Sequence, residues 1–156
     1  MNIYLVRHSR AVDEGPGLAD EDRYLSNEGR ELAVRVGERL AKERIALDRV
    51  LTSPLVRAVQ TAELFVQGLG AKLDVVTLPL LAPGFPPQLV VERLSGYGRS
   101  LALVGHEPTI SALGALLVQR PSFPPLRPMQ VAAIENGAPR WILRPDTLEL
   151  DQLLVA

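Results

Sequence analysis

The segment Arg49-Val-Leu-Thr-Ser-Pro-Leu-Val-Arg-Ala-Val-Gln-Thr61 joins a short apolar strand to the start of a helix. Residues 49–52 predict the strand, and Ser53-Pro54 follows it directly. Because proline is favoured at the first helical position, we expect the helix to begin at Pro54 and to reach about Leu69, where glycines end it. A strand that leads at once into a helix is typical of parallel sheets.

The same alternation continues on both sides of this segment. Residues 2–7 and 100–105 are apolar runs that predict strands buried on both faces of a sheet. The other expected elements are a loop at 9–25, a helix capped by Ser26 and reaching about Arg44, a strand at 73–78, a proline-rich loop at 79–88, a short helix from Gln88 to Leu94, a helix from Pro108 to about Val118, a proline-rich connection at 121–128 and a hairpin of 130–135 with 140–144 across Asn136-Gly137.

Strands that alternate with helices indicate βαβ units. We therefore expect an α/β fold, a three-layer sandwich in which helices cover both faces of a mostly parallel central sheet. A length of 156 residues fits one domain. We expect the hairpin to complete the sheet rather than to form a second domain, so that residues 1–156 are a single domain.

The composition narrows the chemistry that the chain can carry out. It has no cysteine, which excludes disulfides, thiolate metal sites and cysteine nucleophiles, and its two histidines cannot build a three-histidine metal site. We expect no metal ion and no cofactor. A formal net charge of −1 gives no general reason to bind nucleic acid or an acidic membrane. The N-terminus is charged too early for a signal peptide, and no apolar run approaches the ~18 residues of a membrane helix, so we expect a cytoplasmic protein.

Basic side chains stand at the ends of three expected strands. Arg7 ends the first strand and His8 follows it, His106 follows the strand at 100–105, and Arg57 lies in the first turn of the helix after residues 49–52. Taken alone, each is more often structural, because a lone histidine usually packs and a lone arginine usually forms a surface ion pair. Ligands of open α/β sheets, however, bind beyond the carboxyl ends of the strands, beside helix N-termini. Together these residues predict a site for a phosphoryl group.

Three motifs resemble those of the histidine phosphatase superfamily, the phosphoglycerate mutase-like group. They are Arg7-His8-Ser9-Arg10, the block from Ser53 to Thr61 quoted above and Gly105-His106-Glu107-Pro108. The segment Arg23–Gly29 is similar to the helix start of short bacterial members, and length and layout resemble the phosphohistidine phosphatases of the SixA type. The resemblance implies a phosphoglycerate mutase-like fold. It also implies that His8 is the nucleophile, which forms a phosphohistidine intermediate, and that Arg7, Arg57 and His106 hold the phosphoryl oxygens.

Three further residues are candidates for binding the phosphate or the substrate. Ser9 stands where the family usually has glycine, and its hydroxyl could contact a phosphate. Arg23 ends the loop that starts after His8 and could reach back over the phosphate, with an exposed loop arginine as the equal alternative. Glu107 either orients the His106 ring or is a surface carboxylate in the first turn of a helix.

The chain lacks the glutamate that serves as the general acid in many members of the family. Many members carry a glutamate soon after the third strand, whereas residues 78–84 contain no acid. An alkoxide leaving group needs a proton, but an imidazole can carry its own, so this absence favours a phosphohistidine substrate. An acid from the loop at 9–25 is an open alternative; its candidates are Asp13, Glu14, Asp20, Glu21 and Asp22.

We therefore expect a phosphatase whose partner is a phosphorylated substrate, with the phosphohistidine of a histidine-phosphotransfer protein as the first candidate. Two alternatives stay open. One is a small-molecule phosphomonoesterase that acts on a sugar or nucleotide-like phosphate, and the other is a non-catalytic phosphate-binding module. The presence of His8 argues against the second, because an inactive relative would be expected to lose its nucleophile.

Overall fold

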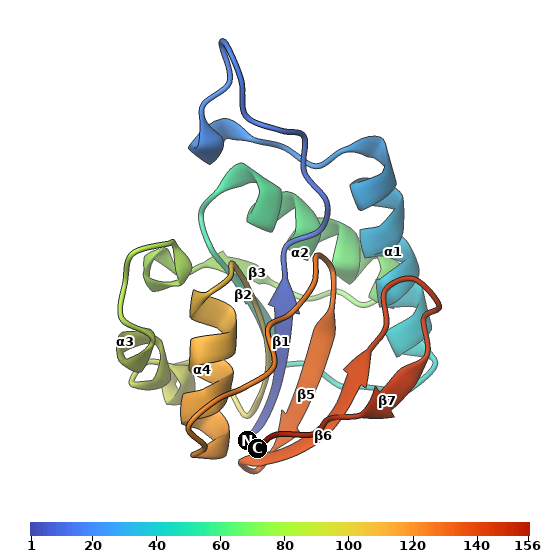
Figure 1. Cartoon of the computed structure of the whole chain (residues 1–156). Helices are drawn as coiled ribbons and strands as arrows, with labels where there is room; N and C mark the ends of the chain where they lie inside the picture. The colour runs from blue at the N-terminus through green and yellow to red at the C-terminus, as the bar shows by residue number, and fades with distance from the viewer.

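Strand β1 (Asn2–Arg7) occupies the centre of the sheet in the computed structural model, which describes residues 1–156 (Figure 1). The seven strands lie in the order β3-β2-β4-β1-β5-β6-β7. Their bounds are β2 (Arg49–Thr52), β3 (Val75–Thr77), β4 (Ser100–Gly105), β5 (Val131–Glu135), β6 (Ala138–Leu143) and β7 (Leu150–Gln152). Strands β1 to β4 pair in parallel, and β5, β6 and β7 are added beside β1 in antiparallel pairs. The sheet is therefore mixed, and its parallel half contains the three sequence motifs.

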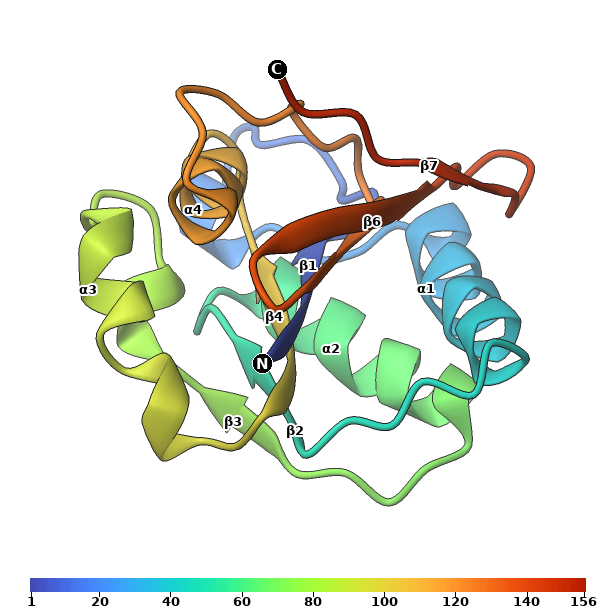
Figure 2. The same ribbon diagram turned by 90° about the horizontal axis from the view of Figure 1, so that it is seen from below.

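Helices cover both faces of the sheet, as Figure 2 shows. Side chains alternate along β1, so that Tyr4 and Val6 belong to one core and Ile3 and Leu5 to the other. Helices α1 (Asn27–Ala41) and α2 (Val56–Leu69) close the first core, and α3 (Pro87–Val91) and α4 (Thr109–Val118) close the second. Three short 3-10 helices join these elements: η1 (Asp20–Asp22), η2 (Pro79–Leu81) and η3 (Leu94–Gly96). The expected three-layer α/β architecture is confirmed.

Helix α2 does not begin at Pro54, as its proline predicts. Its first residue is Val56, and Leu55 is the N-cap, with extended backbone. The Ser53 hydroxyl accepts a hydrogen bond from Leu55 N at 3.2 Å, and Ser53 N continues the sheet by donating to Val104 O at 2.9 Å. These bonds hold the connection outside helical geometry, so the tertiary structure overrides the local preference of proline.

Other element boundaries differ by a few residues. Helix α1 ends at Ala41 rather than at about Arg44, because the next three amides bond three residues back in tighter turns. Strand β3 is shorter than expected, and α3 begins and ends earlier. Strand β7 was not expected, because its three residues are too few to show a hydrophobic pattern. The Ser26 cap and the hairpin turn at Asn136-Gly137, with φ of 51° and 77°, are confirmed. No helix combines the length and the apolar character needed to cross a membrane.

Two glycines set how closely α1 and α2 approach each other (Figure 2). A Cβ atom on Gly37 would lie 2.3 Å from the carbonyl oxygen of Phe65, and one on Gly68 would lie 2.1 Å from that of Val34. Both distances are far inside van der Waals contact, so these positions accept only glycine. The close approach holds α2, which carries Arg57, against α1.

The substitution Gly37→Ala is expected to destabilise the protein by about 1–3 kcal/mol, because the added methyl group forces two helix backbones apart. The free energy of unfolding in urea measures the effect. Gly96→Ala is the matched control, because nothing lies within 4 Å of the Cβ it would add. Equal stability of the two variants would contradict the close packing of α1 on α2.

Candidate active site

The two histidines meet at the carboxyl ends of neighbouring parallel strands. Arg7 lies opposite Gly105 in the pairing of β1 with β4, and His8 N donates to Gly105 O at 3.0 Å. His8 and His106, which directly follow the two strands, therefore stand side by side, with ring centroids 5.2 Å apart and ring planes inclined by 51°. Both side chains are buried. The structure brings together the two residues that the sequence placed at one edge of the sheet.

The His8 ring is held with one nitrogen bonded and the other free. Its Nδ1 lies 2.7 Å from the carbonyl oxygen of Ser9. A carbonyl oxygen only accepts, so Nδ1 carries the ring proton and Nε2 keeps its lone pair. Burial is the main cause that lowers the pKa of His8 to about 4; the bond to Ser9 opposes this shift, and the charges of nearby arginines add to it. The ring is therefore neutral near pH 7, which is the state in which an imidazole attacks.

His106 is also neutral in this arrangement. Its Nε2 lies 2.7 Å from the hydroxyl oxygen of Ser53, at the end of β2, and its Nδ1 is buried without a partner. Burial is the largest cause that lowers the pKa of His106 to about 3; repulsion from His8 when that ring is protonated comes next, and the charge of Arg57 acts in the same direction. The resemblance implied only that His106 holds a phosphoryl oxygen, and left its charge open. The structure presents a neutral ring.

Two arginines complete the basic group. Arg57, in the first turn of α2, is only 6% exposed, and its Nη1 donates to the backbone oxygen of Asp20 at 2.7 Å while its Nη2 lies 3.3 Å from an Asp20 carboxylate oxygen. Arg7 donates from Nη1 to Leu126 O at 3.0 Å. A cation in the first turn of a helix faces the positive end of the dipole, and the Asp20 carboxylate offsets that penalty.

Unpartnered buried polar atoms concentrate at this edge of the sheet. Across the whole chain, four buried side-chain nitrogen or oxygen atoms lack a hydrogen-bond partner, and three of them are Arg7 Nε, Arg57 Nε and His106 Nδ1. Buried polar groups in proteins are nearly always hydrogen-bonded. An oxyanion bound between these residues would offer acceptors to such donors, which is the chemistry of a phosphate site.

Of the three remaining candidates, only Arg23 joins this group. Its Nη1 donates to an Asp20 carboxylate oxygen at 3.0 Å, and its charge contributes to the lowered pKa of His8. The Ser9 hydroxyl instead donates to Gly29 O at 2.7 Å, so it is engaged by α1 rather than free for a phosphate. The Ser9 amide donates to Thr61 Oγ1 at 2.9 Å, and this contact ties the segment after His8 to α2.

Glu107 does not orient His106. Its two carboxylate oxygens accept hydrogen bonds from Leu126 N at 3.0 Å and from the Ser111 hydroxyl at 2.6 Å. Because Leu126 O in turn accepts from Arg7, Glu107 holds the connection that supports this arginine. The carboxylate is thus engaged by the connection at 121–128 and by the first turns of α4, and not by the His106 ring.

The sequence did not single out Asp20. It was one of five acids in the loop at 9–25, and nothing in its local pattern distinguishes it from its neighbours on η1. Only the fold of the loop, fixed by Arg23 Nε donating to Val12 O at 2.7 Å and by the pairing of Ala11 with Leu25, brings it over Arg57.

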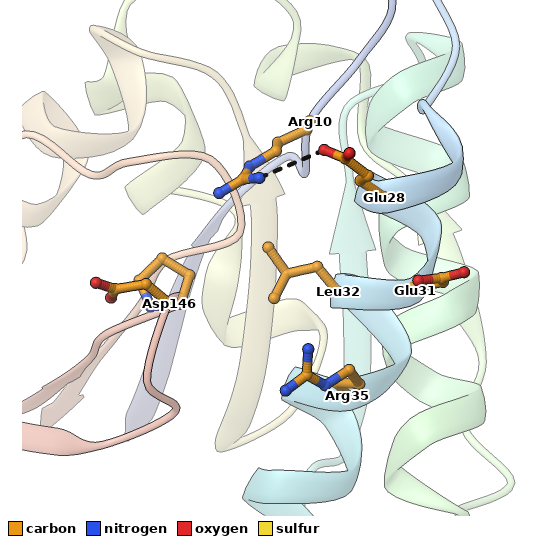
Figure 3. Close-up of a pocket in the computed structure, with 7 residues that line it drawn as sticks. Arg10, Glu28, Glu31, Leu32, Arg35 and Asp146 are labelled. Carbon is orange, nitrogen blue, oxygen red and sulfur yellow. Dashed lines mark ion pairs between the residues drawn. The ribbon is translucent and has the colours of Figure 1, made fainter.

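The largest cavity lies apart from the histidines. Figure 3 shows its lining, with Arg10 and Leu32 on one side and Asp146 across from them; its volume is about 350 Å³. None of its seven lining residues is a predicted site residue. Arg10 and Glu28, which pair there at 3.7 Å, are 55% and 81% exposed, so the cavity is a charged surface hollow.

Comparison with known proteins places the chain in a family and finds a similar SixA sequence and a similar SixA structure. The family model of the histidine phosphatase superfamily (branch 1) matches residues 3–82. The phosphohistidine phosphatase SixA of Escherichia coli (strain K12) is 26% identical over 159 residues, which cover 96% of this chain and 98% of SixA. A solved structure of the protein histidine phosphatase SixA complexed with tungstate has a TM-score of 0.82 and 25% identity, and covers 96% of this chain and 100% of that one.

A third relative matches a smaller part of the chain. The mitochondrial serine/threonine-protein phosphatase Pgam5 of Drosophila grimshawi is 34% identical over 90 residues, which cover 56% of this chain. The match spans only 30% of the length of Pgam5.

The free energy of unfolding is expected to fall as the pH drops from about 6.5 to about 4. An unfolded histidine takes up its proton near pH 6.5, whereas the pKa values of His8 and His106 lie at about 4 and about 3. Between these values the unfolded chain binds more protons, so each histidine adds a slope of up to about 1.4 kcal/mol per pH unit. Urea unfolding at several pH values measures the slope.

The variant His106→Gln isolates one of these contributions, because glutamine does not titrate and the other ionisable groups are unchanged. We expect its slope between pH 6.5 and 4 to be shallower than that of the wild type. A slope that matches the wild type over this range would show that His106 is protonated in the folded protein.

Proposed function

The chain belongs to the histidine phosphatase superfamily (branch 1), and from this membership we propose that it hydrolyses protein phosphohistidine through a phosphorylated intermediate on His8. Proteins of this superfamily, and the SixA relatives, are phosphatases, so the chain is a phosphatase. The observation that carries the finer proposal is the His8 ring, neutral, with its proton on Nδ1 and its Nε2 lone pair free, beside three unpartnered polar groups.

In the first proposed step, His8 Nε2 attacks the phosphorus atom while the bond from phosphorus to the leaving nitrogen breaks. The bonding electrons go to the leaving imidazole, which departs neutral when it carries a proton on its other nitrogen. Phosphoryl transfer passes through a loose transition state, whose charge lies on the three equatorial oxygens. Arg7 and Arg57 place always-charged donors at these oxygens without reorganising at the moment of reaction.

In the second proposed step, water attacks the phosphorus of phospho-His8 and the bond to Nε2 breaks. The electrons return to Nε2, and inorganic phosphate is the product. His106 takes part as a neutral donor: when the Ser53 hydroxyl donates to its Nε2, the ring proton lies on Nδ1, which has no other partner. A neutral donor binds a phosphoryl oxygen without placing a further positive charge beside His8.

Two observations favour a nitrogen leaving group. The segment after β3 begins with η2, Pro79–Leu81, and offers no acid there. The one loop carboxylate at the site, Asp20, accepts a hydrogen bond from Arg23 that holds its pKa below the ordinary value, with the charge of Arg57 acting in the same direction. An acid kept ionised in this way is a poor proton donor to an alkoxide.

The second candidate function is hydrolysis of a phosphate ester. The similarity to Pgam5, whose name describes a serine/threonine-protein phosphatase, supports it over part of the chain. The same phospho-His8 intermediate would form, but the leaving oxygen would need a proton from solvent or from the substrate.

The variant His8→Asn is expected to lower kcat/KM by about a thousandfold or more, because it removes the nucleophile itself. An asparagine amide can still donate to Ser9 O, so the local backbone should keep its shape. Incubation with a phosphohistidine peptide should leave an acid-labile phosphoryl label on the wild type and none on His8→Asn. Circular dichroism and thermal unfolding check that the variant is folded. A labelled or fully active His8→Asn enzyme would contradict the role proposed for His8.

The preference for nitrogen leaving groups is tested by comparing kcat/KM for a phosphohistidine peptide with that for a phosphoserine peptide of the same sequence. We expect a ratio of about a hundredfold or more, which is the range that general acid catalysis contributes. The ester p-nitrophenyl phosphate is the control, because its leaving group needs no proton. Equal turnover of the two peptides would favour the ester phosphatase.

A further inference from the structure

One acidic residue lies among the basic groups of the site. Asp20, the first residue of η1, contacts Arg57 twice: its backbone oxygen accepts from Nη1 at 2.7 Å, and its carboxylate lies 3.3 Å from Nη2. The other carboxylate oxygen accepts from Arg23 at 3.0 Å. Both terminal nitrogens of Arg57 are therefore occupied by a single residue.

A phosphoryl group bound at Arg57 would compete with this carboxylate. A guanidinium binds carboxylate and phosphate oxygens through the same donors. The negative charge of Asp20 also acts on His106, whose pKa it raises against the other causes, so this charge lies near that histidine. Two anions that share one arginine repel each other, so the bound carboxylate weakens the binding of a phosphoryl group.

Asp20 is the partner that can move. Its side chain is 54% exposed, whereas that of Arg57 is 6% exposed. The 3-10 helix η1 has no buried residue, so displacing it removes nothing from either core. Arg57 lies in the first turn of α2, which is packed against α1 at Gly37 and Gly68, and it has no comparable freedom.

We propose that Asp20 is an internal competitor of the phosphoryl group: the substrate displaces its carboxylate from Arg57, and the carboxylate returns to Arg57 after hydrolysis and speeds the release of inorganic phosphate. This inference rests on the proposed function, in which the phosphoryl group binds at Arg57. It makes Asp20 a residue that sets the affinity for phosphate rather than a proton donor.

A different role for Asp20 predicts the opposite result. If the carboxylate served only to hold Arg57 in position, its removal would loosen the guanidinium and weaken phosphate binding. If it competes with phosphate, its removal strengthens phosphate binding. The sign of the change in affinity separates the two roles.

The test is titration of the full chain with inorganic phosphate by isothermal calorimetry, at constant pH and ionic strength. Asp20→Asn removes one charge and keeps the shape of the side chain, and we expect its Kd for phosphate to be about fivefold lower than that of the wild type, from the repulsion between unit charges in water. Asp22→Asn is the matched control, because it makes the same charge change on the same 3-10 helix at an exposed residue without an ion pair; its Kd should stay within about twofold of the wild type.

A second variant tests whether the change in Kd comes from the loss of the carboxylate and not from the new asparagine side chain. Asp20→Ala removes the carboxylate and its hydrogen bond to Arg23, and it should also bind phosphate more tightly than the wild type. Thermal unfolding without phosphate checks that each variant is folded. An unchanged or raised Kd in Asp20→Asn and Asp20→Ala would overturn the inference.

Steady-state kinetics give an independent readout. Inorganic phosphate should inhibit turnover by Asp20→Asn at lower concentrations than it inhibits the wild type, by the same factor as the change in Kd. Unchanged product inhibition would contradict the role in phosphate release.

Arg57→Ala separates this inference from the proposed function on which it rests. Phosphate binding that survives Arg57→Ala would show that the anion binds elsewhere, and the proposed site itself would fail. Phosphate binding that is lost in Arg57→Ala but unchanged in Asp20→Asn would leave the site intact and overturn only the competition by Asp20.

Discussion

The parallel pairing of β1 with β4 is the constraint on which the rest of the site depends. Six consecutive residue pairs hold the register, from Asn2 opposite Ser100 to Arg7 opposite Gly105. Side chains alternate between the two faces of a strand, so a slip of one residue would exchange both cores and separate the two histidines. The pairing of β2 with β4 places Ser53 beside the same edge, within hydrogen-bond distance of His106. The register of the sheet therefore determines which site residues lie close together.

The same edge of the sheet concentrates basic and unpaired polar side chains. The buried Arg57 and the partly buried Arg7 lie next to two buried histidines, and burial together with these charges keeps the histidines neutral. Burying unpaired polar groups is unfavourable, and natural proteins accept such violations mainly at functional sites. In this protein the unfavourable contacts lie at the ends of the central strands and at the start of α2. The compensating carboxylate of Asp20 lies on η1, which has no buried residue.

Much of the fold and of the site followed from local patterns. Short apolar runs at the positions of β1, β2 and β4 are too hydrophobic for any place except the centre of a sheet covered on both faces, and this placed the residues that follow them at one edge. Where expectations differed, contacts between distant residues decided the outcome. Bonds from Ser53 to β4 and to Leu55 delay the start of α2, and Gly29 O captures the Ser9 hydroxyl. Leu126, nineteen residues along the chain, captures the Glu107 carboxylate.

The amino-acid sequence by itself determined the α/β architecture and the chemical identity of the candidate site, because the hydrophobic runs and the residues at their ends are local properties of the chain. The tertiary structure alone decided the protonation state of the two histidines, since burial and neighbouring charges set a pKa and neither can be read from the order of residues. It also decided which of the five loop acids lies at Arg57. An acidic residue acts through its distance from a cation, and in a loop of seventeen residues that distance is fixed by folding.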